Sequence, residues 1–431
     1  MSMSSRKEFL SKIGSGAAAL TLGTFFNPQN TKYILDELGT FNGSAEELAT
    51  NESFWYRVQQ AFTVDRSLIN LNNGGVSPSP DFVQEAMKKH LDFSNQAPVY
   101  NMWRILEPRR EGVRQQLARM FSVDSEEIAL TRNASESLQI CQLGMDLQPG
   151  DQVLTTTHDY PRMINTFKQR ERREGIILKQ FDLPVPAEDE NEIVDLFERN
   201  IGPKTKMILM CHIVNLTGQI LPVKKVVAMA RKKGIPVLVD GAHAFAHFQF
   251  TQEDLDCDYY TTSLHKWLFA PHGTGLLYVK KDKIGDLWPL MAAHENQVDD
   301  IRKFEEIGTH PAANYLAIGE AVTFHEGIGS ERKEARLKYL NDLWIDELID
   351  DPKVTLHTSR NPSFACGIAT VEVKGKDPSE LSSSLWKKHN IIVTPIKHHQ
   401  FNGIRVTPNV YTTTEEIARF TDAMKEEVFD A

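Results

Sequence analysis

The sequence predicts an α/β protein, with a large domain built on a mainly parallel sheet that carries helices on both faces, and a small C-terminal α+β domain. From Glu126 to about Lys281, short β-branched or apolar runs alternate with longer amphipathic runs, which is the pattern of successive βαβ units. After Pro311 the pattern changes to a long helical run followed by strand-like and helical runs in turn. A length of 431 residues exceeds one average domain, which also favours a large domain with a smaller companion.

The large domain is expected to alternate strands with helices. Strands are predicted at residues 152–157, 176–181, 206–214, 235–239, 259–262 and 275–279. Helical patterns at 136–147, 162–174, 193–200 and 223–233 accompany them, with stops at Gly150, Gly175 and Gly234. Because βαβ units align parallel strands, ligands are expected at the carboxyl ends of the strands.

The C-terminal part begins with a helical pattern from 311 to about 349. Strand-like runs follow at 367–373, 391–394 and 403–407, with a helical run at 378–389 and a closing helix. Thr413 and Glu416 have the spacing of a capping box at the start of that closing helix. We therefore expect a large domain at 55–310 and a small domain at 311–431, preceded by an arm at 27–54.

Composition and charge exclude several classes of function. With 41% hydrophobic and 25% charged residues, the chain has the composition of an ordinary globular protein. Its formal net charge of −10 argues against binding nucleic acid or an anionic membrane, and favours a small polar substrate in a cleft. No two of the four cysteines have C-x-x-C spacing, and we expect all four to be buried as small hydrophobic residues.

The first 26 residues have the layout of an export signal, because Arg6 and Lys7 precede an apolar, Gly- and Ala-rich run at 13–26. The segment resembles a twin-arginine (Tat) signal in which Lys7 replaces the second arginine. It predicts export to the periplasm; the alternative is a cytoplasmic protein whose N-terminal helix packs on a partner subunit. No apolar stretch long enough to span a membrane follows it.

The most specific motif is Ser263-Leu264-His265-Lys266-Trp267, followed by a Gly- and Pro-rich loop. A lysine just after a strand end lies near the ligand edge of the sheet, where a desolvated amine can form a Schiff base. Asp240 ends an apolar run 26 residues earlier and is followed by Gly241-Ala242-His243. A carboxylate there can pair with a pyridinium nitrogen and keep it protonated.

Together these residues resemble the class V aminotransferase family of fold-type I enzymes that use pyridoxal 5′-phosphate (PLP), from about residue 55 onward. The resemblance implies a mainly parallel seven-stranded-type sheet, a Schiff base on Lys266 and a pyridine partner in Asp240. It also implies a homodimer, because Thr309 resembles the threonine that reaches the phosphate from a second subunit.

Further cofactor-binding residues follow from the resemblance. The turn at 131–137 resembles the phosphate-binding turn, where the N–H groups of Ala134 and Ser135 open a helix. The resemblance places Ser263 and His265 on the same phosphate, Tyr160 on the cofactor ring, and Asn215 and His243 near the phenolic oxygen. Tyr160 could instead be a plain core residue.

The predicted substrate is an amino acid or a peptide-like amine. Arg405 matches the arginine that clamps the substrate carboxylate, a function suited to its bidentate fork, although a surface arginine on a strand is the alternative. The resemblance places Gly75 in the entry loop, and Tyr100 and Arg104 at the substrate entrance. His243 and His247 are spaced as a metal pair, but no H-E-x-x-H motif is present and no metal is expected.

The motifs at 71–75, 158–160 and 240–243 look most like the isopenicillin N epimerase-like branch, and they predict an epimerase or racemase with Lys266 as a base at the Cα. An aminotransferase is the alternative. A cysteine desulfurase or lyase is less favoured, since the stretch 394–402 holds no cysteine. A protein that binds PLP without turnover is also less favoured. A second acid or base would be needed for epimerisation, and His398, His399 and Tyr411 are candidates.

Overall fold

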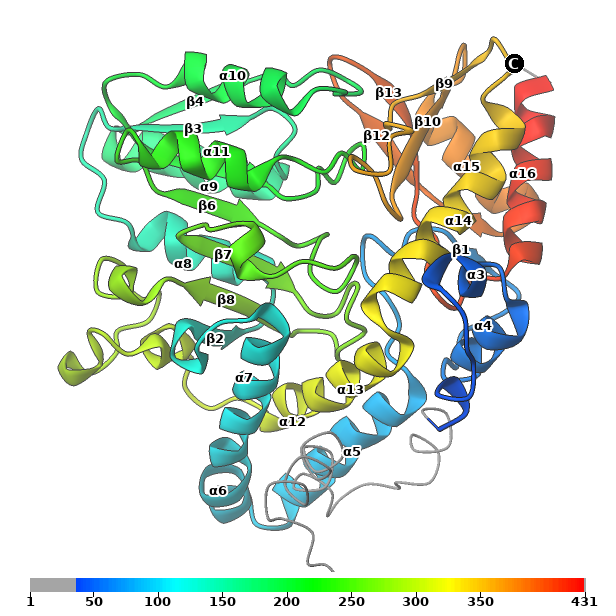
Figure 1. The fold of residues 1–431 in the computed structure, drawn as a ribbon. Coiled ribbons are helices and arrows are strands. Elements are labelled where there is room, and N and C mark those ends of the chain that lie inside the picture. Colours follow the sequence, from blue (N-terminus) through cyan, green and yellow to red (C-terminus); the bar gives the residue numbers. More distant parts are fainter. Residues whose placement is uncertain (1–35, 430–431) are drawn as a thin grey trace, which may run out of the picture.

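The computed structural model describes residues 36–429, and its larger part is a seven-stranded sheet in the order β2-β8-β7-β6-β5-β3-β4. Only β8 runs antiparallel to its neighbours, so the predicted mainly parallel sheet is confirmed. Figure 1 shows this sheet on the left. Its strands are β2 (Ile128–Thr131), β3 (Gln152–Thr156), β4 (Ile177–Phe181), β5 (Thr205–Cys211), β6 (Val237–Asp240), β7 (Tyr259–Ser263) and β8 (Gly275–Val279).

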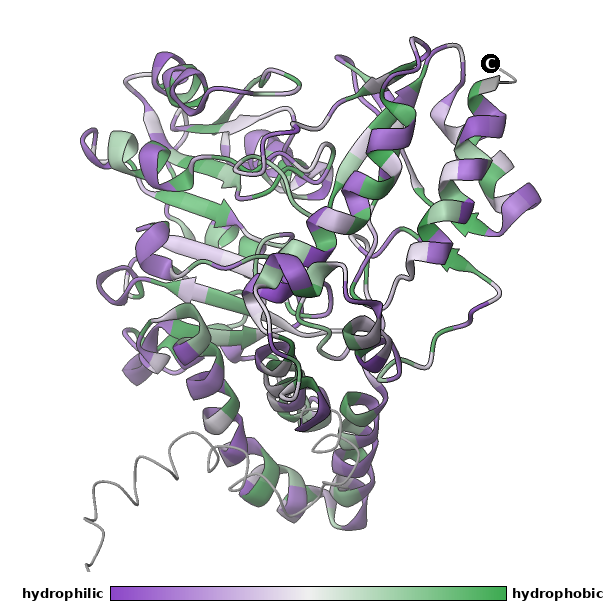
Figure 2. Cartoon of the chain, turned by 45° about the vertical axis from the view of Figure 1, so that its right-hand side comes forward, coloured by the Kyte–Doolittle hydropathy of each residue, from purple (hydrophilic) through white to green (hydrophobic). Residues whose placement is uncertain are grey.

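Both faces of this sheet are buried. Alternate residues of each strand point to opposite faces, so each strand contributes side chains to the packing on both sides. On β5, Met207 and Leu209 pack in one apolar cluster with α8 (Ala134–Gly144) and α9 (Pro161–Glu174). Ile208 and Met210 pack in another cluster on the far side, with α7 (Glu107–Phe121), α10 (Glu190–Asn200) and α11 (Val223–Arg231). Apolar residues accordingly concentrate on the strands in Figure 2.

Two details of the large sheet differ from the prediction. Strand β2 was not predicted; it has only four residues and lies between the short 3-10 helix Ser125–Glu127 and the loop that begins α8. Strand β5 ends at Cys211 rather than at 214, because Val214 N–H donates to Gln219 O in a turn that carries Asn215.

The C-terminal part contains a four-stranded antiparallel sheet in the order β12-β13-β10-β9. The predicted run at 311–349 is three helices, α12 (Ala312–Leu316), α13 (Ile318–Ile328) and α14 (Ser330–Leu348), since Gly329 has a φ of +90° between the last two. The capping box of Thr413 and Glu416 is formed. The remaining elements are β9 (Val354–Leu356), β10 (Ala369–Val373), α15 (Pro378–His389), β11 (Ile391–Ile392), β12 (Thr394–Lys397), β13 (Asn402–Val406) and α16 (Thr414–Phe429).

The N-terminal described elements pack against this C-terminal part (Figure 1). Arg336 on α14 donates to Ala49 O at 2.9 Å, and β1 pairs in parallel with β11. The domain boundaries stay a prediction, and the export signal at 1–26 lies outside the described residues. These elements are α3 (Ala45–Ala49), α4 (Glu52–Gln59), β1 (Ile69–Asn70), α5 (Asp81–Gln96), α6 (Pro98–Tyr100) and the π-helix η1 (Asn101–Leu106).

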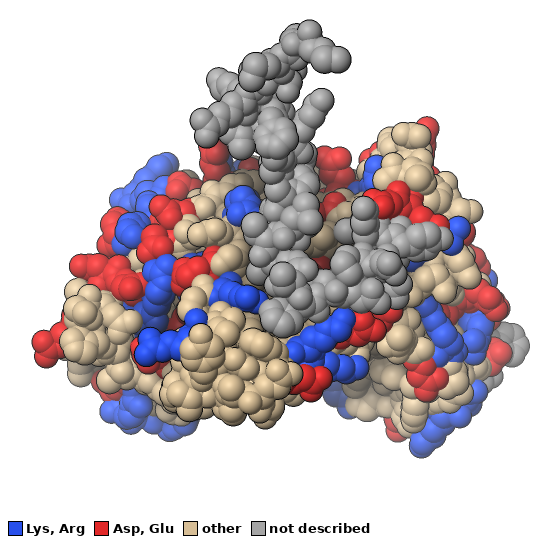
Figure 3. Space-filling view, turned by 90° about the horizontal axis from the view of Figure 1, so that it is seen from below, with Lys and Arg blue, Asp and Glu red and all other residues tan. Residues whose placement is uncertain are grey.

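The described surface bears charges of both signs. On the face shown in Figure 3, lysines and arginines are interspersed with aspartates and glutamates. Among residues 36–429, no helix is long and apolar enough to cross a membrane. Over the same residues, no group of three or more His, Cys, Asp or Glu side chains is placed to hold a metal ion.

Candidate active site

A cavity of about 350 Å³ lies at the carboxyl ends of the large sheet's parallel strands and reaches the small domain. This is the edge at which such sheets bind ligands. Eleven of the predicted site residues line it: Gly75, Ala134, Ser135, Tyr160, Asn215, Asp240, His243, Ser263, His265, Lys266 and Arg405.

Lys266 lies in the loop that follows β7, with its amine directed at His243. The Lys266 Nζ is 3.2 Å from His243 Nε2. Burial lowers the pKa of Lys266 to about 8, an effect that the nearby Asp240 carboxylate partly opposes. Burial also holds the pKa of His243 well below its ordinary value, so its imidazole is neutral and can accept from the amine. Lys266 is therefore a partly buried amine that loses its proton more easily than an exposed lysine.

Asp240 ends β6, between β5 and β7, at the centre of this edge. One carboxylate oxygen accepts from Ala242 N–H at 3.0 Å. Burial raises the pKa of Asp240 to about 6, the backbone bond and the Lys266 charge opposing this. The negative charge of this buried carboxylate is only partly compensated by its neighbours, so it is suited to a cationic partner such as a pyridinium nitrogen.

An anion cradle forms where α8 begins. Asn133 caps the helix by accepting from Glu136 N–H, and Ala134 N–H donates to Ser263 Oγ at 2.9 Å. Gly275 allows this approach, because a Cβ there would lie 2.6 Å from the Asn133 Cα. His265 donates from Nδ1 to Thr274 O at 3.0 Å, which leaves Nε2 for a ligand. Helix N–H groups and the helix dipole at this point favour a phosphate.

Arg405 reaches the cavity from β13 of the small domain and is 6% exposed. Its guanidinium donates to Asn215 O and to Asn72 Oδ1, each at 3.0 Å. Burial lowers the pKa of Arg405 to about 10, so it stays cationic at neutral pH. A buried cation with no carboxylate within salt-bridge distance among the described residues is suited to clamp the carboxylate of a substrate.

Tyr160 follows β3 and precedes α9. The turn before it is fixed by Asp159, whose carboxylate accepts from Thr156 N–H at 3.0 Å and from Thr156 Oγ1 at 2.6 Å. The side chain of Tyr160 lines the cavity and keeps 39% of its surface exposed. It is therefore not a plain core tyrosine.

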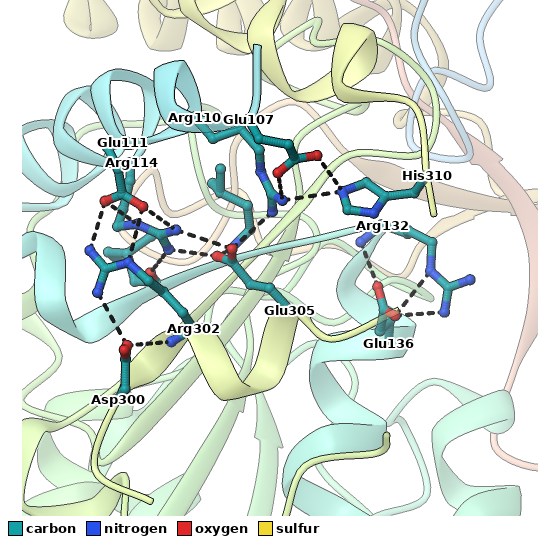
Figure 4. A network of polar contacts seen from close by, with 12 residues as sticks. Glu107, Arg110, Glu111, Arg114, Arg132, Glu136, Asp300, Arg302, Glu305 and His310 are labelled. Atoms are coloured by element: carbon teal, nitrogen blue, oxygen red, sulfur yellow. Dashed lines mark hydrogen bonds and ion pairs between the residues drawn. The ribbon is translucent and has the colours of Figure 1, made fainter. Parts of the chain in front are cut away.

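Three predicted site residues lie outside the cavity of their own chain. Tyr100 is 62% exposed on α6, and Arg104 is exposed on η1. Thr309 is exposed on a segment that a charge network anchors (Figure 4). In that network Arg110 donates to Glu305 at 2.8 Å and to His310 Nε2 at 3.1 Å, on either side of Thr309 in sequence.

The structure adds residues to the cavity that the sequence did not indicate. Thr394 and Ile396 come from β12, and Cys211 from the end of β5. All four cysteines of the chain are buried, as predicted. Cys211 donates from Sγ to Asp159 Oδ1 at 3.3 Å, and burial raises its pKa well above the ordinary value. His247 has both ring nitrogens engaged, with His243 O and Gly367 N–H, so it has none left for a metal.

Several buried polar atoms at the cavity have no hydrogen-bond partner among residues 36–429. They are His243 Nδ1, Asn215 Oδ1 and Arg405 Nε. Unpaired buried polar atoms are costly, and they mark a place where a ligand completes the hydrogen bonding. Together with the anion cradle, the Lys266 amine and the Asp240 carboxylate, they fit a phosphate-bearing pyridine aldehyde.

Comparisons with known proteins agree with this fit. The chain is 28% identical to isopenicillin N epimerase of Streptomyces clavuligerus, over 86% of the chain and 97% of that protein. It is 26% identical to a probable cysteine desulfurase of Halalkalibacterium halodurans, over 74% of the chain and 80% of the relative. The structure of a cysteine desulfurase from Thermococcus onnurineus matches with a TM-score of 0.74 at 23% identity, over 84% of this chain and 95% of that one.

The family model for class V aminotransferases matches residues 69–420, which include all the cavity residues described above. The matched proteins share the fold-type I architecture, and the cofactor is pyridoxal 5′-phosphate. The chain is a PLP-dependent enzyme and belongs to the class V aminotransferase family.

Proposed function

We propose that this enzyme inverts the configuration at the Cα of an amino acid or a peptide-like amine. The observation that carries the proposal is the pairing, in one cavity, of a buried amine of lowered pKa with a buried guanidinium. Arg405 holds the substrate carboxylate, and Lys266 then takes the Cα proton. When bound, the cofactor supplies a delocalised system that stabilises the charge left at the Cα.

The residues around the cavity support proton transfer at the Cα. Asp240 would pair with a cationic ring nitrogen of the cofactor, and His243 accepts from the Lys266 amine and orients it. Gly74 is closely packed at the cavity, since a Cβ there would meet Thr407, His243 and Arg405 at 3.2 to 3.5 Å. Close packing of this kind limits the water beside the buried charges, which strengthens the electrostatic contacts inside.

The state of the cysteines weighs against a desulfurase. That reaction needs a reactive thiolate, which requires a lowered pKa and access to the substrate. Burial instead raises the pKa of all four thiols, and in Cys366 it raises the pKa to about 12. The relatives named as epimerases and as desulfurases are similarly distant from this chain, so the thiols carry more weight than the names.

The test is incubation of the holoenzyme with a panel of L-amino acids and small peptides in D₂O. Inversion with deuterium at the Cα is expected for at least one compound, read by chiral chromatography and mass spectrometry, and Lys266→Ala should abolish it. Formation of a keto acid in place of the opposite enantiomer would make the enzyme an aminotransferase. Absence of Cα exchange across the panel would contradict the proposal.

Two further proposals concern the oligomeric state and the cellular location of the enzyme. We infer a homodimer with a shared active site, because Thr309 lies outside its own cavity. We also infer export through the Tat-like segment at 1–26, on the strength of its sequence alone. Fractionation of cells that produce the full chain tests the second; recovery only in the cytoplasm would contradict it.

A further inference from the structure

We infer that Tyr160 is the second acid and base of the enzyme, acting from the wall of the cavity opposite to Lys266. The inference rests on the proposed inversion at the Cα. Inversion requires that a proton leave one side of the carbon and that another arrive from the other side. A single lysine returns the proton to the side from which it came, so a second group is needed.

The ionisable groups that line the cavity are few, and two of them lie on the side of Lys266. His265 shares its loop, and His243 contacts its amine. The full set of ionisable lining residues is Tyr160, Cys211, Asp240, His243, His265, Lys266 and Arg405.

Three of the remaining groups are committed elsewhere. Asp240 lies at the centre of the sheet edge, where its carboxylate would hold the ring nitrogen of the cofactor. Cys211 donates a hydrogen bond to the buried Asp159. Arg405 stays cationic and binds carboxylate. Tyr160 is thus left as the lining group whose hydroxyl, among the described residues, has no hydrogen bond assigned to it.

The strand order places Tyr160 across the cavity from Lys266. Tyr160 follows β3 and Lys266 follows β7, with β5 and β6 between them. Three strand spacings of about 4.8 Å separate the two positions by roughly 14 Å at the sheet edge. Both residues line the same cavity, so a substrate bound between them has the amine on one side and the phenol on the other.

Two properties of Tyr160 suit a proton donor. It lines the same cavity as Arg405, the residue suited to clamp the substrate carboxylate. Its 39% exposure lets the hydroxyl exchange protons with water between turnovers. The turn held by Asp159 and Thr156 fixes the backbone from which the ring projects.

The other candidates do not line the cavity. His399 pairs with Asp182 at 2.9 Å, and the His398 ring packs against His158 with 4.8 Å between centroids. Tyr411 is buried and donates to Asn73 Oδ1. The geometry leaves Tyr160 as the group with access to the substrate.

One turnover leaves the protonation states of Lys266 and Tyr160 as they were at the start. Lys266 Nζ takes the proton as the Cα–H bond breaks, and Tyr160 Oη gives its proton as the new Cα–H bond forms on the other side. The phenolate then regains a proton from water, and the ammonium of Lys266 releases one. In the reverse direction the two groups exchange roles, and nothing is oxidised or reduced.

The test compares the wild type with Tyr160→Phe, which keeps the ring and removes the hydroxyl. Tyr56→Phe on α4, where Tyr56 is 54% exposed, is the matched control. In D₂O, Tyr160→Phe should lose inversion by about 100-fold or more, the contribution typical of a positioned acid. It should still exchange the Cα hydrogen of one enantiomer with retention, at a rate within about fivefold of the wild type.

The bound cofactor provides a readout that does not depend on turnover. Tyr160→Phe should retain the visible absorbance and the cofactor affinity of the wild type, since the aromatic face remains. Inversion by Tyr160→Phe at the wild-type rate would overturn the role of Tyr160 and leave the proposed function intact. A wild-type enzyme that exchanges the Cα hydrogen without inversion would overturn both.

Discussion

At the scale of single residues, the burial of Lys266 determines the pH range in which the enzyme can take up its cofactor. Because burial lowers its pKa to about 8, about a tenth of the amine is neutral at pH 7, against roughly one part in 2,500 for an exposed lysine. The rate at which the apoprotein attaches PLP should rise about tenfold per pH unit below pH 8 and level off above it. Stopped-flow absorbance measures this, and a rise that continues to pH 10 would contradict it.

Gly275 provides a second test at this scale. Gly275→Ala puts a Cβ 2.6 Å from the Asn133 Cα, so the start of α8 must shift and the anion cradle with it. Cofactor affinity should fall more than about tenfold, the loss expected from one hydrogen bond to a charged group. Gly112→Ala is the control, because no atom lies within 4 Å of that Cβ and an alanine within α7 should stabilise by about 0.5–1 kcal/mol. Equal cofactor affinity of both variants by fluorescence titration would refute the close approach.

Sequence alone could predict the site residues that sit in local motifs. Lys266, Asp240 and Arg405 each follow or lie in a recognisable strand, and the strand edge brings them together. Thr394 and Cys211 could not be found this way, because the first enters the cavity through the register of β12 with β13 and the second is an ordinary apolar residue in sequence. Their positions depend on pairings between segments far apart in the chain.

At the scale of elements, α13 carries a buried carboxyl group whose ionised form is destabilised. Glu320 is buried with its Oε2 unpaired, and burial raises its pKa to about 8. Between its ordinary pKa and 8, the unfolded chain releases a proton that the folded chain keeps, so stability falls as pH rises through this window. Glu320→Gln should therefore raise the free energy of unfolding by about 2–3 kcal/mol at pH 7 and change it little at pH 4.

Urea unfolding of the apoprotein at the two pH values measures this effect. Glu253→Gln, at an exposed position, is the control and should shift stability by less than about 0.5 kcal/mol at both. A Glu320→Gln effect that is the same at pH 4 and pH 7 would show that folding does not raise the pKa of this carboxyl group.

The elements themselves could largely be predicted because their patterns are strong. The helix at Pro378–His389 has the predicted bounds, since Asp377 caps it and Asn390 ends it in a left-handed conformation. The prediction of one helical run at 311–349 was wrong, because apolar periodicity continues through the break at Gly329. Strand β2 was missed because four residues carry too little pattern.

At the scale of the whole molecule, the position of Thr309 leads to a prediction about assembly. Its segment is ordered by Glu305 and His310, both bound to Arg110, yet Thr309 itself is exposed and outside its own cavity. Large apolar side chains are also exposed: Trp288 by 72%, Met291 by 51% and Trp103 by 51%. Burying such side chains favours association, and a Thr309 that serves the cavity of a second copy requires that copy, so the chain should sediment as a dimer.

A shared site makes this prediction sharper than an oligomeric state alone. Thr309→Asp would bring a carboxylate toward the phosphate of the partner's cofactor, and cofactor affinity should fall by about tenfold or more through like-charge repulsion. Co-expression of Thr309→Asp chains with Lys266→Ala chains should then restore activity, because each mixed dimer has one site with both substitutions and one with neither. If each chain kept Thr309 at its own site, every site would carry one substitution, and the mixture would be no more active than its parts.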